Sequence, residues 1–481
     1  MMEQTEGQNP HHVAPEHALS AIAAHQGPAV VDFDETLYLR NSTSDFLSSA
    51  RPALLAFVLV KVIDVIKPWR FGAGGDELRD MWRVRVLLAL MPWTKGRWQR
   101  QAASSARFAL NERLASSLRV GERPVFVSTL GFEPIVRPLL DAFDIGKLEL
   151  VAMDPWDSEQ HGRGKMALTS EAIGGQTLAA STFVTDSEVD RELLDASALP
   201  MLVTWPEAGP GETFHRVYYP GRYLTKVKRP GSRYMRKIFK EDIALWILST
   251  IWVAANPITD TIGLLLLALS FWAVYETGYV DNDLVADRYE DEPALTEEFR
   301  KRMVTYPPWV PLAWSGVLGL LGLLVLRIPD LPSTADCLLW ALVLWVSVGV
   351  FRIYNRLDKG TRVLLFPVLQ LLRTAAFIVV VPTVAIAILA IAIHVIMRWV
   401  SYYVYRTVPG GWPGSADMLV VRVVVFVSLG TLLISQQDDW SELWSATTLS
   451  LLAWHLFLAR REIPAAIRNA HRIDRERAPA D

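Results

Sequence analysis

Cysteine is nearly absent from this chain, whose 481 residues include one, Cys337. A single cysteine excludes an intramolecular disulfide, and because no CxxC pair or Cys/His cluster is present we expect no structural zinc site. A surplus of one charge sign is also lacking, since 48 Lys and Arg stand against 51 Asp and Glu, for a net charge of −3. This net charge says little about partners, because basic and acidic residues are segregated along the chain; we expect no nucleic-acid partner. The sequence gives no indication of oligomeric state.

The first 20 residues, MMEQTEGQNPHHVAPEHALS, lack the apolar stretch of a cleavable signal peptide. We expect residues 1–27 to form a disordered N-terminus. The chain is too long for one ordinary domain. Hydrophobic residues make up 51% of it, and their excess lies after about residue 240. This distribution predicts a polar head, expected to stay in the cytoplasm, followed by an all-α membrane body.

Apolar windows close to the roughly 20 residues of a bilayer-spanning helix recur after residue 240. They are residues 242–256, 258–277, 310–327, 335–353, 363–397, 417–435 and 441–459. The window 363–397 is long for one span and contains Pro367, Arg373 and Pro382. As one span it would place the basic C-terminal tail outside the cytoplasm, whereas a hairpin of two spans returns the tail inside, as the positive-inside rule favours. We therefore predict eight spans, within a range of seven to nine.

The expected domain boundaries follow from these composition changes. A head domain occupies residues 28–205, a linker residues 206–240, the membrane body residues 241–460, and a basic tail residues 461–481. The segment PEAGPGE interrupts regular structure in the linker, and residues 222–240 carry eight Lys and Arg. Topology alone explains this basic run; attraction to anionic lipid headgroups is a second, compatible explanation.

Polar side chains follow the predicted buried strands of the head. They are Asp32, Asp34 and Thr36 in AVVDFDETLYL, Ser128 or Thr129 in VFVST, Lys165 in GRGKM, and Asp186 and Asp190 in FVTDSEVD. Such strand ends line the crevice where open α/β sheets bind ligands. The residue types suit phosphoryl transfer: one carboxylate attacks phosphorus, a second protonates the leaving oxygen, a further acid holds Mg²⁺, and lysine and hydroxyl groups neutralise charge. Alternatively, the aspartates cap helices or belong to a degenerate site.

DFDET resembles the DxDxT first motif of the haloacid dehalogenase (HAD) superfamily, and Ser128, Lys165 and TDSEVD resemble its second, third and fourth motifs. The resemblance covers roughly residues 28–205 and implies a Rossmann-like α/β phosphatase domain. It implies that Asp32 is the nucleophile, Asp34 the acid/base and Lys165 the charge stabiliser. The phosphate ligands would be Thr36 and Ser128. The Mg²⁺ ligands would be Asp32, Asp34, Asp186 and Asp190.

Between the first and second motifs lies an insertion at about residues 40–120, which contains RPALLAFVLVKVIDVIKPWRF. Lys61 and Asp64 interrupt this apolar run, so we do not expect it to span a membrane. The pattern fits a helical cap that lies on the membrane surface. A cap helix buried within the head explains it equally well.

An acidic segment, YETGYVDNDLVADRYEDEP at residues 275–293, begins where the second apolar window ends. Asp283, Asp287 and Asp291 recur every four residues and would lie near one face of a continuing helix. Carboxylates placed so repel one another unless cations lie between them, as in a Mg²⁺-bridged diphosphate site. A solvated acidic loop beside the membrane is the alternative.

This segment resembles the first aspartate-rich motif, NDxxDxxxD, of the UbiA family of intramembrane prenyltransferases, with Asn282 as its first residue. The segment YNRLDKGTRVLLFPVLQLLR resembles the family's Tyr-and-Lys loop, with Tyr354 and Lys359. Asp283 and Asp287 are four residues apart where the family has three, and no second DxxxD motif follows in the later cytoplasmic loops.

A HAD head fused to a UbiA-like body implies an enzyme of the bacterial inner membrane that uses Mg²⁺ and acts on a polyprenyl phosphate or diphosphate. The body would transfer a prenyl or phosphoribosyl group, and the head would hydrolyse the resulting phosphomonoester. Two alternatives stand beside this bifunctional enzyme. In one, the body is a non-catalytic anchor or lipid-binding scaffold for an active phosphatase. In the other, both sites are relics in a protein that transports or organises something.

Overall fold

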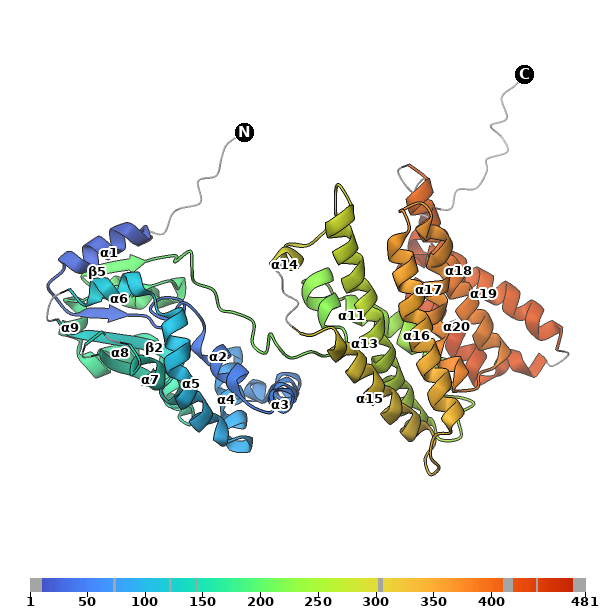
Figure 1. Ribbon diagram of the computed structural model, residues 1–481, viewed down its shortest axis with the longest axis horizontal. Coiled ribbons are helices and arrows are strands. Elements are labelled where there is room, and N and C mark those ends of the chain that lie inside the picture. Colours follow the sequence, from blue (N-terminus) through green and yellow to red (C-terminus); the bar gives the residue numbers. More distant parts are fainter. Residues whose placement is uncertain are drawn as a thin grey trace, which may run out of the picture. The chain divides into compact units, whose positions relative to one another are not determined.

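The computed structural model describes residues 11–71, 75–120, 123–143, 145–146, 148–301, 306–409, 418–437 and 440–469. The chain divides into two compact units, Met1–Val217, called the head, and Tyr218–Asp481, called the body (Figure 1). The division falls inside the predicted linker 206–240. Its basic part belongs to the body, because Leu224, Val227 and Ile238 are buried there.

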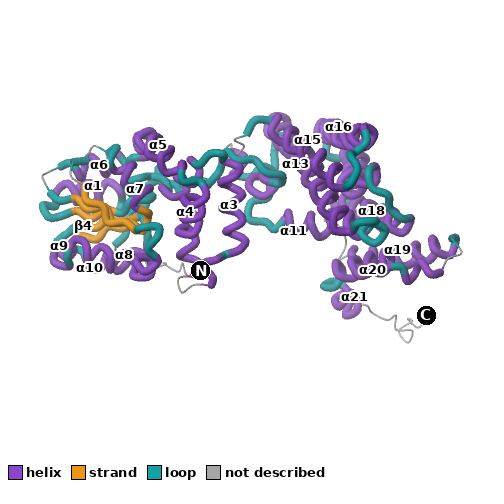
Figure 2. Tube along the Cα trace, turned by 90° about the horizontal axis from the view of Figure 1, so that it is seen from below, coloured by secondary structure: helices purple, strands orange, loops and turns teal. Residues whose placement is uncertain are grey.

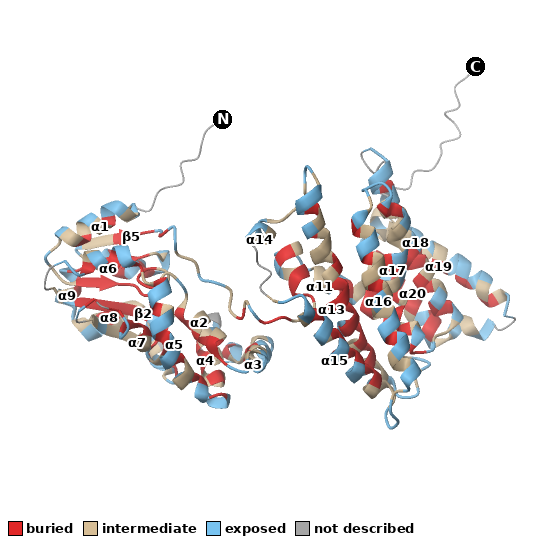
Figure 3. Ribbon diagram, viewed as in Figure 1, coloured by how far each residue is buried: buried red, intermediate tan, exposed pale blue. Residues whose placement is uncertain are grey.

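The head is built on a parallel sheet (Figure 2). The strands are β1 Ala29–Val31, β2 Val125–Phe132, β3 Leu148–Met153, β4 Thr182–Thr185 and β5 Leu199–Leu202. The central strands β1, β2 and β4 are buried, whereas the outer strands β3 and β5 are partly exposed (Figure 3). Their order in the described sheet is β3-β2-β1-β4-β5, and Val31 lies opposite Val127 on one side and Val184 on the other. This order reverses between β1 and β4, the point where doubly wound α/β sheets bind ligands. The predicted α/β class of the head is confirmed.

Helices surround this sheet, and the first of them corrects an expectation. They are α1 Pro15–Ala24, α7 Glu133–Leu140, α8 Ser158–Ile173, α9 Gly175–Ala179 and α10 Arg191–Ala196. Helix α1 buries Ala18 and Ile22, and a backbone bridge joins His12 to Leu202. The predicted disorder of residues 1–27 is therefore wrong for residues 15–24, because an apolar face packs onto the head. Residues 1–10 lie outside the described part.

The insertion between β1 and β2 is helical where it is described, as expected. It contains α2 Ser42–Ser49, α3 Ala53–Ile66, α4 Arg79–Leu90, α5 Trp93–Ala109 and α6 Glu112–Leu118. Helix α3 packs against α4 and buries Ala56 and Val60, while most of its other apolar side chains are exposed (Figure 3). A fully buried cap helix is therefore not what the chain forms.

The body is helical throughout its described residues. Its helices are α11 Tyr234–Ile238, α12 Ala244–Leu248, α13 Pro257–Tyr289, α14 Glu297–Arg300, α15 Trp309–Leu326, α16 Thr334–Arg356, α17 Arg362–Ala375, α18 Ala385–Thr407, α19 Met418–Ser435, α20 Ala446–Ala459 and α21 Ile463–Asn469. Six helical segments among the described residues are long and apolar enough to cross a membrane: α13, α15, α16, α17 with its extension to Val379, α18 and α19. This supports an integral membrane protein.

The predicted count of eight spans is not confirmed. The window 242–256 forms the short helix α12 and turns instead of a spanning helix, and the window 441–459 yields α20, a helix of 14 residues. The window 363–397 does divide into two helices, α17 and α18, as the hairpin interpretation requires.

Glycines let the long helix α13 approach its neighbours closely. A Cβ atom at Gly278 would lie 2.3 Å from the Phe351 ring on α16, and one at Gly263 would lie 3.0 Å from the Gly322 carbonyl on α15. Small residues at such crossings allow backbones to pack tightly in membrane proteins. This packing fixes the end of α13 that carries the predicted acidic motif.

Candidate functional site

The centre of the head's site is an ammonium group between two carboxylates. Lys165 Nζ lies 2.7 Å from Asp32 Oδ1 and 2.6 Å from Asp190 Oδ2, and the lysine side chain is 9% exposed. Asp32 directly follows β1, and its N–H donates to the Val184 carbonyl on β4. Lys165 follows Gly164, whose φ of 77° breaks α8. The glycine turn predicted from GRGKM is therefore present, and it changes the direction of the chain directly before Lys165.

Thr185 joins this cluster, although the sequence did not single it out for a role. Its hydroxyl oxygen lies 3.0 Å from Asp32 Oδ2 and 2.7 Å from Asp190 Oδ2. The Ser187 N–H donates to the same oxygen at 3.1 Å, so the hydroxyl proton is left for one carboxylate at a time. The sequence did contain one indication of this role, because Thr185 is the last residue of β4 and directly precedes Asp186.

Thr36 and Asp186 form a second pair across the same edge of the sheet. The Thr36 hydroxyl donates to Asp186 Oδ1 at 2.8 Å, and the Asp186 N–H donates back to Thr36 Oγ1 at 3.1 Å. A turn with Glu35 at a φ of 60° leads the chain into Thr36. The ends of β1 and β4 therefore meet, as predicted from the sequence.

Asp34 lies where the insertion begins. Its carboxylate accepts from the Ser42 N–H at 2.6 Å and from the Ser42 hydroxyl at 3.1 Å. It thus contacts the start of α2, whose N-cap residue is Asn41. Burial raises the pKa of Asp34 to about 7, against the two hydrogen bonds from Ser42. A carboxyl group with this pKa can both donate and accept a proton near neutral pH.

Ser128 supports the lysine turn. It is fully buried, and its hydroxyl lies 2.6 Å from Thr169 Oγ1, while the Thr169 hydroxyl donates to the Lys165 carbonyl at 2.7 Å. Ser128 therefore donates to Thr169. Thr129, the other candidate for this position, accepts from the Gly131 N–H at 2.9 Å.

Negative charge exceeds positive charge in this site. Burial raises the pKa of Asp32, Lys165 opposes this, and Asp190 and Asp186 add to the rise. Burial disfavours the charged form of Lys165, yet Asp32 and Asp190 together raise its pKa. Burial also raises the pKa of Asp186. When all are ionised, the three carboxylates of Asp32, Asp186 and Asp190 carry more charge than the single ammonium of Lys165 neutralises, and burial disfavours that fully ionised state.

The excess of negative charge in the head's site matters for the predicted binding of Mg²⁺. Among the described residues, no group of three or more His, Cys, Asp or Glu side chains is arranged to hold a metal ion. Magnesium does not need such a cage, because proteins usually hold it by one or two carboxylates while waters and substrate phosphates complete the octahedron. Asp32 and Asp186 are of the right ligand type for such a site, although Asp32 already contacts the Lys165 ammonium. The other two predicted ligands, Asp34 and Asp190, are held by Ser42 and Lys165.

In the body, a cavity of about 400 Å³ brings several predicted residues together. Asn282, Asp283, Tyr354 and Lys359 all line it. Asp287 and Asp291 do not: they are exposed and line a neighbouring hollow, which shares Glu290, Lys359 and Arg362 with the cavity. The prediction that Asp283, Asp287 and Asp291 share one cation site is therefore corrected. Helix α13 ends at Tyr289, so Asp291 leaves the helical face that would align it.

Asp283 already has a positive partner. It is 3% exposed, forms an ion pair with Lys228 through Oδ1 and accepts from the Tyr223 hydroxyl at 2.7 Å through Oδ2. Both contacts come from the basic segment 222–240, which the sequence predicts to lie in a linker. The charge of this aspartate is thus neutralised within the body.

Basic side chains outnumber acidic ones around this cavity in the described residues. The basic residues are Lys228, Arg229, Lys359, Arg362 and Arg406, and the acidic ones are Asp283 and Glu290. Aromatic rings supply much of the remaining wall, including Phe366 and Tyr402, whose ring centroids lie 4.1 Å apart. A cavity that is basic and aromatic suits an anionic group attached to an apolar chain.

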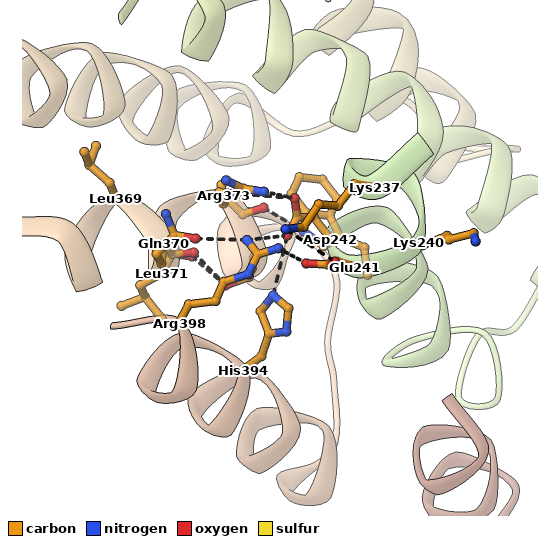
Figure 4. Close-up of polar contacts among 12 residues, drawn as sticks. Lys237, Lys240, Glu241, Asp242, Leu369, Gln370, Leu371, Arg373, His394 and Arg398 are labelled. Carbon is orange, nitrogen blue, oxygen red and sulfur yellow. Dashed lines mark hydrogen bonds and ion pairs between the residues drawn. The ribbon is translucent and has the colours of Figure 1, made fainter. Parts of the chain in front are cut away.

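A buried ion network holds one wall of the cavity (Figure 4). Arg373 Nε donates to Asp242 Oδ2 at 3.0 Å, and Arg398 Nη1 lies 3.2 Å from Asp242 Oδ1. Arg398 Nη1 also donates at 2.9 Å to Oε1 of Gln370, which lines the cavity. His394 Nε2 lies 3.6 Å from Asp242 Oδ1. The signal for this network was present in the sequence, because Asp242 and Arg373 lie inside apolar windows where charge is expensive.

No protein-family model, curated protein or solved structure matches this chain. Its function is therefore inferred from its own residues.

Proposed function

We propose that the chain is a membrane-bound enzyme acting on polyprenyl phosphates, and that its head is a HAD-type, Mg²⁺-dependent phosphatase. The contact of Lys165 with both Asp32 and Asp190 supports this most, because it lies where the strand order reverses between β1 and β4. A buried lysine beside a carboxylate at that position suits a phosphoryl group in transfer. The DFDET, GRGKM and TDSEVD motifs support the same proposal.

The proposed reaction has two steps. An oxygen of Asp32 attacks phosphorus, and the bond to the leaving oxygen breaks while Asp34 gives that oxygen its proton. Asp34, now ionised, takes a proton from water, whose oxygen attacks the aspartyl phosphate and releases inorganic phosphate and Asp32. Lys165 and Thr36 offset the charge on the phosphoryl oxygens. Mg²⁺ held by Asp32 and Asp186 would further stabilise that charge.

For the body, we propose that the cavity on α13 binds a polyprenyl phosphate or diphosphate and that the body transfers a prenyl or phosphoribosyl group. The basic and aromatic lining supports binding of such a lipid. The clustering of Asn282, Asp283, Tyr354 and Lys359 supports the resemblance to UbiA-like enzymes. The product would be a phosphomonoester on which the head acts.

A second candidate is favoured by the Lys228–Asp283 ion pair. An aspartate that already accepts from Lys228 and Tyr223 has little negative charge left for Mg²⁺. In this version the body binds the lipid but transfers nothing, and the head is the active enzyme.

Two variants of the full-length protein separate these proposals. Phosphate release and group transfer are measured with Mg²⁺ for Asp32→Asn and Asp283→Asn, with Asp195→Asn on the exposed surface of α10 as the matched control. The bifunctional enzyme loses release in the first variant and transfer in the second. Release without transfer in the unmutated protein supports the scaffold. Absence of both overturns the enzymatic proposal and favours relic sites.

A further inference from the structure

Helix α3 of the head carries an apolar face that the head leaves uncovered. Large apolar side chains on it are between 42% and 80% exposed: Leu54, Leu55, Val58, Val62, Val65 and Ile66. Phe71, in the turn that follows, is 89% exposed. The spacing of 54, 58, 62 and 65 places these side chains on one side of the helix. A contiguous exposed apolar face of this kind marks an interaction surface.

The exposed charged side chains beside the apolar face of α3 are basic. Lys61 is 56% exposed at its side chain, makes a long contact of 3.7 Å with Asp64 and lies 5.7 Å from the centroid of the Phe57 ring. Asp64 is itself paired with Arg83 at 2.7 Å, so the acid is neutralised from within the head. Lys67 follows at the C-terminal end of the helix. The exposed face is therefore apolar with a basic edge, which complements an anionic lipid surface.

The head is tethered to the candidate membrane-spanning helices because the two units belong to one chain. The head ends at Val217 and the body begins at Tyr218, with the basic segment 222–240 next and the first candidate spanning helix starting at Pro257. A tethered surface binds at high effective concentration, so weak intrinsic affinity suffices. With 14 residues, α3 is too short to cross a bilayer, which takes roughly 20.

We propose that the outer face of α3 lies in the interface of the lipid bilayer and holds the head at the membrane surface. The apolar side chains enter the boundary between headgroups and acyl chains, while Lys61 and Lys67 contact anionic headgroups. This contact would keep the crevice at Asp32 close to lipid-borne substrates. The proposal does not depend on the catalytic activity of either unit.

The test places one fluorophore on the full-length protein. Cys337 is the only cysteine, so a Cys337→Ser background allows Val62→Cys to be labelled alone, with Ser116→Cys on the exposed surface of α6 as the control. The proteins are reconstituted in nanodiscs that contain anionic lipid and nitroxide-labelled lipid, with the nitroxide either near the headgroup or at the end of the acyl chain.

An interfacial helix inserts about 5–10 Å, so shallow nitroxides are expected to quench the Val62 probe more than deep ones. The Ser116 probe is expected to show little quenching. Replacing Lys61 and Lys67 by Gln is expected to shift the docking equilibrium about fivefold per lysine in anionic bilayers, with little change in neutral ones. A water-exposed Val62 probe overturns the proposal. A blue-shifted probe that lipid nitroxides do not quench also overturns it, because protein then covers the face, either the body or a second copy.

Discussion

Lys165 and Asp190 are joined by an ion pair of 2.6 Å whose side chains are 9% and 7% exposed. Asp32 shares the same ammonium group, so one cation serves two carboxylates that follow the neighbouring strands β1 and β4. The lysine is consequently a structural centre of the head, and in the proposed phosphatase it would offset the charge of the transferring phosphoryl group.

Removing this ammonium should reduce both activity and stability. In Lys165→Met, Asp32 and Asp190 remain buried without their partner, which costs about 3–5 kcal/mol of unfolding free energy. Phosphate release should fall by about 10²–10³-fold, the loss typical for one charge-stabilising donor. Denaturant unfolding and initial rates measure the two effects. Lys165→Met with Asp190→Asn should regain part of the stability but none of the activity; recovery of activity in this double variant would argue against the role of Lys165.

Asp34 should determine how the rate depends on the leaving group. Asp34→Asn should slow release from alkyl phosphates by about 10²–10⁴-fold, the usual contribution of a general acid. Release from p-nitrophenyl phosphate should change far less in its first step, because that leaving group needs no proton. A burst of p-nitrophenol followed by slow turnover would reveal the trapped aspartyl phosphate. Equal losses on both substrates would assign Asp34 a structural role at α2 instead.

The raised pKa of Asp34 also gives stability a definite pH dependence. The folded head holds this proton up to about pH 7, whereas the unfolded chain releases it near the ordinary value of 3.8. Between these values the folded state binds more protons, so this group's contribution to stability declines as the pH rises and is constant above about 7. Thermal unfolding across this range should show a flatter profile for Asp34→Asn. An unchanged slope would mean that the aspartate titrates normally.

The body should depend on the buried network around Asp242. Arg373→Met leaves Asp242 with a weakened set of partners and should destabilise the body by about 3–5 kcal/mol. Arg352→Met, an exposed arginine on α16, should change stability by about 0.5 kcal/mol or less. Thermal unfolding in detergent measures both. Pairing Arg373→Met with Asp242→Asn should restore part of the loss; equal behaviour of Arg373→Met and the control would contradict the importance of the network.

The cavity cations should control lipid binding without affecting the head. Arg229 lies over the Tyr234 ring and Arg406 over Tyr402. Replacing either by Gln removes a charged donor worth about 1.5–3 kcal/mol, so the affinity for a polyprenyl phosphate should fall about 10- to 100-fold. Native mass spectrometry of lipid binding measures this, and phosphate release from a soluble phosphosugar should be unchanged. Unaltered lipid affinity would place the lipid elsewhere.

The meeting of the aspartates in the head was predictable because strand ends converge. Asp32, Asp186 and Asp190 follow strands that a parallel sheet brings to one edge, whereas Lys165 lies inside α8 and was expected there from its glycine turn and the HAD resemblance. Thr185 was not predicted, because a buried threonine at a strand end is indistinguishable from a core residue until its hydrogen-bond partners are seen. The helix at residues 15–24 was missed because its apolar face is narrow, with Ala18 and Ile22 buried in a polar segment.

The body was less predictable because its contacts depend on helix packing. A regular four-residue spacing indicates a shared helical face, but it cannot show that α13 ends before Asp291 or that Lys228 reaches Asp283 from a segment predicted to be a linker. Hydropathy likewise predicted a span at residues 242–256, where the charge of Asp242 is instead satisfied by Arg373 and Arg398.

The measurement that tests the central proposal most directly is phosphate release by the full-length protein with Mg²⁺, from phosphosugars and polyprenyl-linked phosphosugars, compared with Asp32→Asn and the Asp195→Asn control. Release that disappears in Asp32→Asn and persists in the control is expected if Asp32 is the nucleophile of a phosphatase. Release that persists in Asp32→Asn, or is absent from the unmutated protein on every substrate, would contradict it.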